Sequence, residues 1–301
     1  MRYLPFIPIE NSQWVVFGLL SAAIVSVWIP KDRFDWKYPY ASIGLFLSAL
    51  LAAAFYGYVG LIAIPFILLF AGGFVLLRQE RFLFKFLGTV FIGVLSIGLM
   101  LHTVPGFHNP ALIKNATISP DGIPYSQNLN FDKALIGFFY LLLGTTVIRT
   151  LREVKESAKI YGIGVGLILA CVLPSSVVMG YVRPDLKFGG FFLRWAWVNL
   201  FFTCLAEEAF FRGFIQHRLS MLWARTRYGA VAALVVSSLL FGVAHFAGGF
   251  KYIVLATIAG TGYGLVYSRA RHIEASVLTH FSVNAAHFVF FTYPALSRTV
   301  A

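Results

Sequence analysis

Residues 84–101 read FKFLGTVFIGVLSIGLML, and after Lys85 this stretch contains no charged side chain. As a helix it is about 27 Å long, close to the roughly 30 Å hydrocarbon core of a bilayer. Nine other apolar stretches are comparable, and the ten occupy residues 14–29, 41–56, 59–77, 84–101, 134–148, 160–182, 189–215, 229–246, 252–268 and 275–293. Because open strands would leave backbone groups unpaired in lipid, the sequence predicts an all-α integral membrane protein, a polytopic helix bundle of about ten transmembrane helices.

The composition agrees with a multi-pass membrane protein. Of the 301 residues, 59% are hydrophobic and only 12% are charged, whereas soluble domains average about a quarter charged. The net charge of +12 does not indicate nucleic-acid binding, because Lys and Arg collect in short connections between the apolar stretches. Sixteen of the 24 lie in the odd-numbered connections. The positive-inside rule therefore predicts that these connections are cytoplasmic and that both termini are external, most simply in a bacterial inner membrane.

The chain is predicted to have two parts. Residues 1–133 form an N-terminal transmembrane extension of about four helices, which ends in a long connection, 103–133. This connection is rich in Pro, Gly, Asn and Asp, residues typical of turns, and is expected to form an external cap over the bundle. Residues 134–301 form the core, because the polar motifs within apolar stretches all lie there.

The first motif contains two adjacent glutamates and an arginine, Glu207, Glu208 and Arg212. Carboxylates in lipid are costly and mark functional positions when they occur. Glu208 and Arg212 are four residues apart, so they can form an ion pair along one helix face. Glu207 points elsewhere, by roughly 100° per residue, and is left without that partner. We therefore predict a structural role for Glu208 and Arg212 and general-base work for Glu207.

Two further motifs add imidazole and amide groups. Phe241 and His245 are four residues apart, as are His280 and Asn284. An imidazole and an amide on one face can hydrogen-bond a developing oxyanion. His245 could orient an attacking water or protonate a leaving amine, with Phe241 as a wall of the cavity. Together with a carboxylate base, this set suffices for adding water to an amide carbonyl without a covalent nucleophile.

In order and spacing, Glu-Glu-x-x-x-Arg, Phe-x-x-x-His and His-x-x-x-Asn resemble the motifs of the CPBP family, which comprises CAAX-prenyl endopeptidases and bacteriocin-processing enzymes. The resemblance implies a glutamate-type intramembrane protease with an all-helical core. It implies that Glu207 activates water with His245 as its partner, that His280 and Asn284 form the oxyanion site, and that Arg212 supports Glu208. It also implies a protein or peptide substrate, which could be lipidated or membrane-anchored, with membrane lipids around it and no cofactor.

Several alternatives remain open at this point. Glu207, His245 and His280 could form a His₂Glu zinc site of the same protease, although His-Glu-x-x-His is absent and we expect no metal. Buried carboxylates and histidines also mark ion paths, so a transporter is possible, as is a non-enzymatic immunity-type protein. Helical rise puts His245 about 24 Å from the cytoplasmic end of its helix, but His280 only about 8 Å from the end of its own. The membrane face to which the cavity opens is therefore left undecided.

Overall fold

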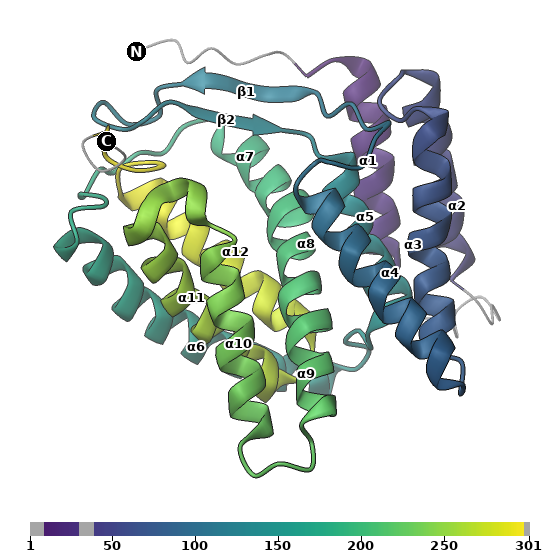
Figure 1. Cartoon of the computed structure of the whole chain (residues 1–301). Helices are drawn as coiled ribbons and strands as arrows, with labels where there is room; N and C mark the ends of the chain where they lie inside the picture. The colour runs from purple at the N-terminus through teal and green to yellow at the C-terminus, as the bar shows by residue number, and fades with distance from the viewer. Residues whose placement is uncertain (1–8, 30–38, 298–301) are drawn as a thin grey trace.

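The computed structural model describes residues 9–29 and 39–297, and each of the ten apolar stretches is helical there (Figure 1). The α-helices are α1 (Asn11–Ser26), α2 (Tyr40–Phe55), α3 (Ile64–Leu77), α4 (Phe82–Met100), α5 (Phe131–Phe139), α6 (Leu151–Val178), α7 (Phe192–Val198), α8 (Leu205–Glu208), α9 (His217–Leu222), α10 (Gly229–Val243), α11 (Gly249–Ala270) and α12 (Ile273–Phe290). Short 3₁₀ turns are η2 (Leu61–Ala63) and η6 (Phe246–Gly248), and π-helical segments are η3 (Tyr140–Gly144), η4 (Asn199–Cys204) and η5 (Ala209–Gln216).

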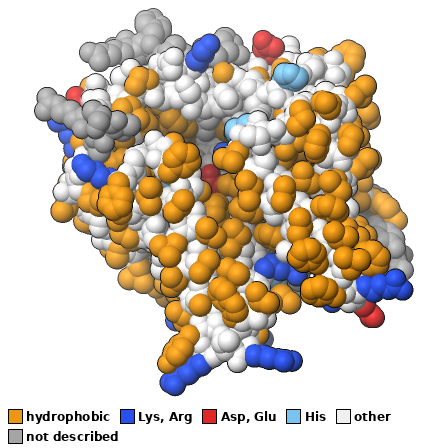
Figure 2. Space-filling model, viewed as in Figure 1, with side chains coloured by type: hydrophobic (Ala, Val, Ile, Leu, Met, Phe, Trp, Pro, Cys, Tyr) orange, Lys and Arg blue, Asp and Glu red, His pale blue; other side chains and the backbone are white. Residues whose placement is uncertain are grey.

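The outer surface of the bundle is apolar, as expected for contact with lipid. Large side chains such as Leu51, Leu68 and Val231 are exposed, and Figure 2 shows hydrophobic side chains over most of the visible face. Among the described residues, the helical stretches Phe82–Met100, Leu151–Val178 and Phe246–Ala270 are long and apolar enough to cross a membrane, and four shorter helices are apolar. The helical class is therefore confirmed, whereas the full set of ten spans stays a prediction.

The connection 103–133 contains a small sheet that the sequence analysis did not predict. Strands β1 (Ala111–Ala116) and β2 (Tyr125–Asn128) pair antiparallel and lie across one end of the helices (Figure 1). The register shifts twice within these few residues. In β1 the buried residues Leu112 and Ile113 are adjacent, as are the exposed residues Lys114 and Asn115. A strand is recognised in a sequence from strict alternation of apolar and polar residues. The irregular pairing of β1 with β2 removes this alternation.

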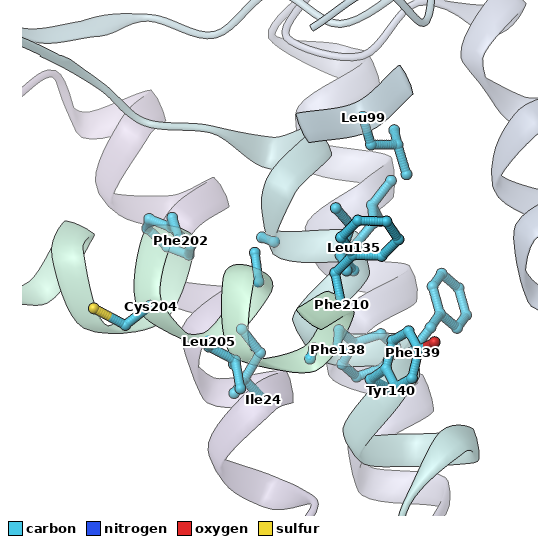
Figure 3. Close-up of a cluster of buried hydrophobic side chains, with 14 of the residues drawn as sticks. Ile24, Leu99, Leu135, Phe138, Phe139, Tyr140, Phe202, Cys204, Leu205 and Phe210 are labelled. Atoms are coloured by element: carbon cyan, nitrogen blue, oxygen red, sulfur yellow. The ribbon is translucent and has the colours of Figure 1, made fainter. Parts of the chain in front are cut away.

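Close packing between α5 and α8 determines where the first motif lies. A Cβ atom added to Gly137 of α5 would be 2.6 Å from Cγ of Leu205, so only glycine allows this approach. Figure 3 shows Leu205 and Phe202 in one cluster with Leu135 and Phe138. This core also includes side chains from α1 to α4, so both predicted parts of the chain share it. The predicted boundary at residue 133 falls in the first turn of α5.

The helices extend to different lengths beyond the two histidines, which accounts for the unequal distances of His245 and His280 from the predicted cytoplasmic ends of their helices. The connection between α9 and α10, with Arg225 and Arg227, protrudes beyond the start of α12 (Figure 1). The helix that leads to His245 therefore begins farther from the site than the helix that carries His280. The predicted cytoplasmic residues Lys31, Arg33 and Lys37, and both chain termini, lie outside the described residues.

Candidate active site

The two glutamates lie on α8, a single α-helical turn between the π-helical segments η4 and η5. With α7 and α9 these segments form one continuous helical stretch, 192–222. π-helical turns are rare and occur frequently at functional sites. Glu207 is 8% exposed, while Glu208 and Arg212 are fully buried. The sequence thus places three ionisable side chains inside the bundle on a locally irregular helix.

Glu208 and Arg212 form the predicted ion pair. Arg212 Nε lies 3.2 Å from Glu208 Oε2, and Arg212 Nη2 donates a hydrogen bond of 2.8 Å to the carbonyl oxygen of Gly260. The guanidinium also lies over the Phe241 ring, 4.5 Å from its centroid. A Cβ atom on Gly260 would be only 2.9 Å from that ring and 3.2 Å from Nη2. Phe241 and Gly260 therefore hold the charged pair in position. Phe241, predicted as a wall of the cavity, thus also contacts the guanidinium of Arg212.

Glu207 faces two imidazole rings. Its Oε2 atom is 3.9 Å from Nε2 of His245 and 4.0 Å from Nε2 of His280. These separations exceed direct hydrogen bonds but suit a bridging water. His245 comes from the end of α10 and His280 from α12, so three helical stretches converge on one carboxylate.

The other ring nitrogens determine which tautomer each histidine adopts. Nδ1 of His245 lies 2.7 Å from the carbonyl oxygen of Phe241, which can only accept, so Nδ1 carries the proton. Nδ1 of His280 lies 2.9 Å from Glu208 Oε1 and donates to it in the same way. In the neutral rings both Nε2 atoms therefore present lone pairs toward Glu207.

Asn284 is oriented by a residue that the sequence analysis missed. Its Nδ2 donates to Oδ1 of Asn199 at 3.3 Å and lies 3.5 Å from the thiol sulfur of Cys204, a weak acceptor. The Cys204 thiol in turn donates to Asn199 Oδ1 at 3.2 Å. Asn199 therefore fixes the amide orientation of Asn284.

A sequence signal for the missed residues did exist. Asn199, Thr203 and Glu207 recur every four residues in one apolar stretch, and Ser276 precedes His280 by four. Ser276 is fully buried and donates its hydroxyl proton to Glu208. Such spacing places polar groups on one helix face. No comparable pattern identifies Tyr263, whose ring stacks on His280 with centroids 4.6 Å apart.

A cavity of about 510 Å³ lies beneath strand β2. All four predicted catalytic residues are among its lining residues, Glu207, His245, His280 and Asn284, with Asn199 and His287 beside them. Figure 2 shows a recess in this face with an acidic side chain at its bottom. Strand β2 of the connection 103–133 forms its roof, so the cavity lies toward the end of the bundle that carries this connection.

The donors that could hold a metal are Glu207 Oε2 and the two Nε2 atoms. Tetrahedral zinc ligands at 2.0–2.1 Å from the ion are roughly 3.3 Å apart, whereas Glu207 Oε2 is 3.9 Å from Nε2 of His245 and 4.0 Å from Nε2 of His280. In the described part of the chain, no group of three or more His, Cys, Asp or Glu is close enough to hold an ion. Metal binding here would require the three side chains to move closer together.

Comparison with known proteins agrees with the resemblance drawn from the motifs. Residues 189–286 match the family model of Rce1-like proteins, the type II CAAX prenyl endopeptidases. No curated protein and no solved structure matches the chain. The matched segment contains Glu207, Arg212, His245 and His280 together with Asn284. This segment therefore matches the Rce1-like type II CAAX prenyl endopeptidase family, which confirms the resemblance to the CPBP family.

Proposed function

We propose that the chain is an intramembrane endopeptidase that hydrolyses a peptide bond of a protein or peptide at or within the membrane. The observation that carries the proposal is the position of Glu207, whose carboxylate faces two imidazole Nε2 atoms at water-bridging distance in a cavity. The family match supports hydrolysis of peptide bonds and a substrate with a prenylated end. A lipidated or membrane-anchored substrate also suits a cavity buried within an apolar bundle.

In the proposed reaction, Glu207 acts as the general base. A water between Glu207 and His245 donates one proton to the carboxylate as its oxygen bonds to the scissile carbonyl carbon. The carbonyl oxygen becomes an oxyanion. The carbon–nitrogen bond then breaks as the oxyanion collapses, and the proton held by Glu207 passes to the leaving nitrogen. The products are a carboxylic acid and an amine, so one water is consumed for each bond cut.

Asn284 is the principal candidate for stabilising the oxyanion. It can donate in every protonation state, and its contact with the Cys204 sulfur is weak enough to be replaced by an oxyanion. His280 can donate from Nε2 only when both ring nitrogens carry protons, because Nδ1 is committed to Glu208. We therefore propose that His280 contributes as an imidazolium and that Asn199 keeps Asn284 oriented.

The position of the cavity beneath β2 supports a proposal for the side from which the substrate enters. The strands belong to connection 103–133, which the distribution of Lys and Arg predicts to be external. We propose access from the external side of a bacterial inner membrane, with both termini on that side. The N-terminal extension, residues 1–133, would then contribute the roof as well as four helices.

The test of this function is the variant Glu207→Gln, which keeps the shape but cannot accept a proton. Cleavage should fall by at least roughly 10²-fold while the protein still inserts and accumulates. Proteomics of protein termini in cells with wild type and with the variant would identify the termini that depend on Glu207. Glu80→Gln is the matched control, because Glu80 is exposed on the connection between α3 and α4. Termini and peptide cleavage that are unchanged in Glu207→Gln would contradict the proposal.

A zinc-dependent form of the same protease is the second candidate. One observation favours it, since carbonyl and carboxylate partners on Nδ1 turn the lone pairs of both Nε2 atoms toward Glu207. Metal-ligating histidines usually have such partners. In that form Glu207, His245 and His280 would hold the ion, which would supply an activated water. The wide separation of Glu207 Oε2 from both Nε2 atoms favours the metal-free form.

A further inference from the structure

The roof of the cavity has an open strand edge. Each strand of a two-stranded sheet has one partner, and among the described residues β2 pairs only with β1. No backbone hydrogen bond joins Tyr125–Asn128 to any other described segment. The backbone groups on the outer side of β2 are therefore available to another chain.

This open edge borders the catalytic cavity. Side chains alternate between the two faces of a strand, so a cavity that touched one face of β2 would contact every second residue. All four residues of β2, Tyr125, Ser126, Gln127 and Asn128, line the cavity that contains Glu207. The cavity therefore follows the edge of the strand and not only one face.

Two unsatisfied acceptors lie beside this edge. Gln127 is only 8% exposed, and its Oε1 atom has no hydrogen-bond partner among the described residues. Oδ1 of Asn130 is also buried without such a partner. Both residues line the cavity. A buried acceptor without a donor destabilises the protein, so a ligand that brings N–H groups would be favoured here.

The side chain of Asn130 lacks a hydrogen bond that its position would normally provide. It occupies the N-cap position of α5, where asparagine normally accepts a hydrogen bond from the first turn of the helix. Its side chain makes no capping hydrogen bond. Asn130 therefore lacks the local contact that its position normally provides, and the residue lines the cavity.

We infer that the substrate binds as an extended polypeptide that adds to the free edge of β2, with Gln127 and Asn130 accepting hydrogen bonds from it. An added strand lies about 4.8 Å from its neighbour, with its N–H and C=O groups turned alternately toward it. Strand addition is a recurring mode of peptide recognition, in which the main chain supplies the affinity. The inference rests on the proposed function, because it assigns the peptide next to Glu207 as the substrate.

The probe is an internally quenched peptide ending in S-farnesylcysteine-Val-Ile-Ala, together with a series in which one backbone nitrogen at a time is methylated. Methylation of alternate nitrogens should raise KM for wild type, and Kd for Glu207→Gln, by roughly two- to tenfold for each hydrogen bond lost. The intervening nitrogens should tolerate methylation. Hydrogen exchange of the backbone amides of residues 125–128 in Glu207→Gln should slow when the unmethylated probe binds.

A side-chain variant gives a second, independent readout. Gln127→Met keeps the side-chain length but removes the unpaired oxygen, so it should raise the unfolding temperature while raising KM about two- to tenfold with little change in kcat. If Gln127 had only a structural role, its replacement by Met would not raise both the unfolding temperature and KM. Gln79→Met is the matched control, since Gln79 is exposed on the connection between α3 and α4.

The two proposals fail in distinguishable ways. Wild type could cleave the probe while methylation has no alternating effect and the β2 amides gain no protection from hydrogen exchange. This result would overturn strand addition and leave the proposed protease activity supported. If Glu207→Gln binds the probe with the alternating pattern but wild type does not cleave it, the protease is overturned and the strand site stands. Absence of both binding and cleavage overturns both.

Discussion

Removal of Arg212 tests how the buried charges hold the site together. Arg212→Met preserves much of the side-chain volume but leaves the fully buried Glu208 carboxylate without its ion-pair partner. It also removes the hydrogen bond to Gly260 and the cation over the Phe241 ring. Breaking one side of a buried pair typically costs roughly 3–5 kcal/mol, because the remaining charge is uncompensated. The free energy of unfolding in detergent should therefore fall by about this amount, and activity should fall with it because Glu208 orients His280.

The double variant Glu208→Gln with Arg212→Met separates charge from packing. It leaves no unpaired buried charge, and neutral replacement of a whole buried pair is often tolerated. Most of the lost stability should therefore return, measured by thermal and denaturant unfolding of both variants beside wild type. If Arg212→Met is as stable as wild type but inactive, the ion pair is not structural and Arg212 contacts the substrate or the oxyanion directly. A double variant less stable than Arg212→Met would refute the charge argument.

Two further predictions concern the chemistry of the cavity. Asn284→Ala should lower turnover by about 10²–10³ with little change in KM, and Asn284→Asp should be at least as damaging because a carboxylate repels the oxyanion; an active Asn284→Asp enzyme would refute the donor role. Activity of the purified protein should survive strong chelation, and elemental analysis should find well under one zinc per chain. If chelation inactivates it and zinc restores it, Glu207, His245 and His280 are metal ligands.

Local patterns explain why the helices and the central motif could be predicted. Apolar stretches near the thickness of a bilayer identify helices without knowledge of their neighbours. The Glu208–Arg212 pair follows from four-residue spacing alone and is present, even though π-helical turns flank it. The two strands could not be predicted, because Leu112 and Ile113 are adjacent and both buried, so no alternation is visible.

The sequence by itself determined the helical membrane class and the polar residues that face one another along single helices. These features depend on spacing within one element, where the 3.6-residue helical period applies. Only the tertiary structure decided that Nδ1 of His245 and of His280 is held by an acceptor, that Asn199 orients Asn284, and that β2 roofs the cavity. Each of these depends on side-chain or backbone contacts whose geometry no sequence spacing specifies, and most of them join different elements. Such contacts arise from close packing, as where Gly137 admits Leu205 and so sets the position of α8 against α5.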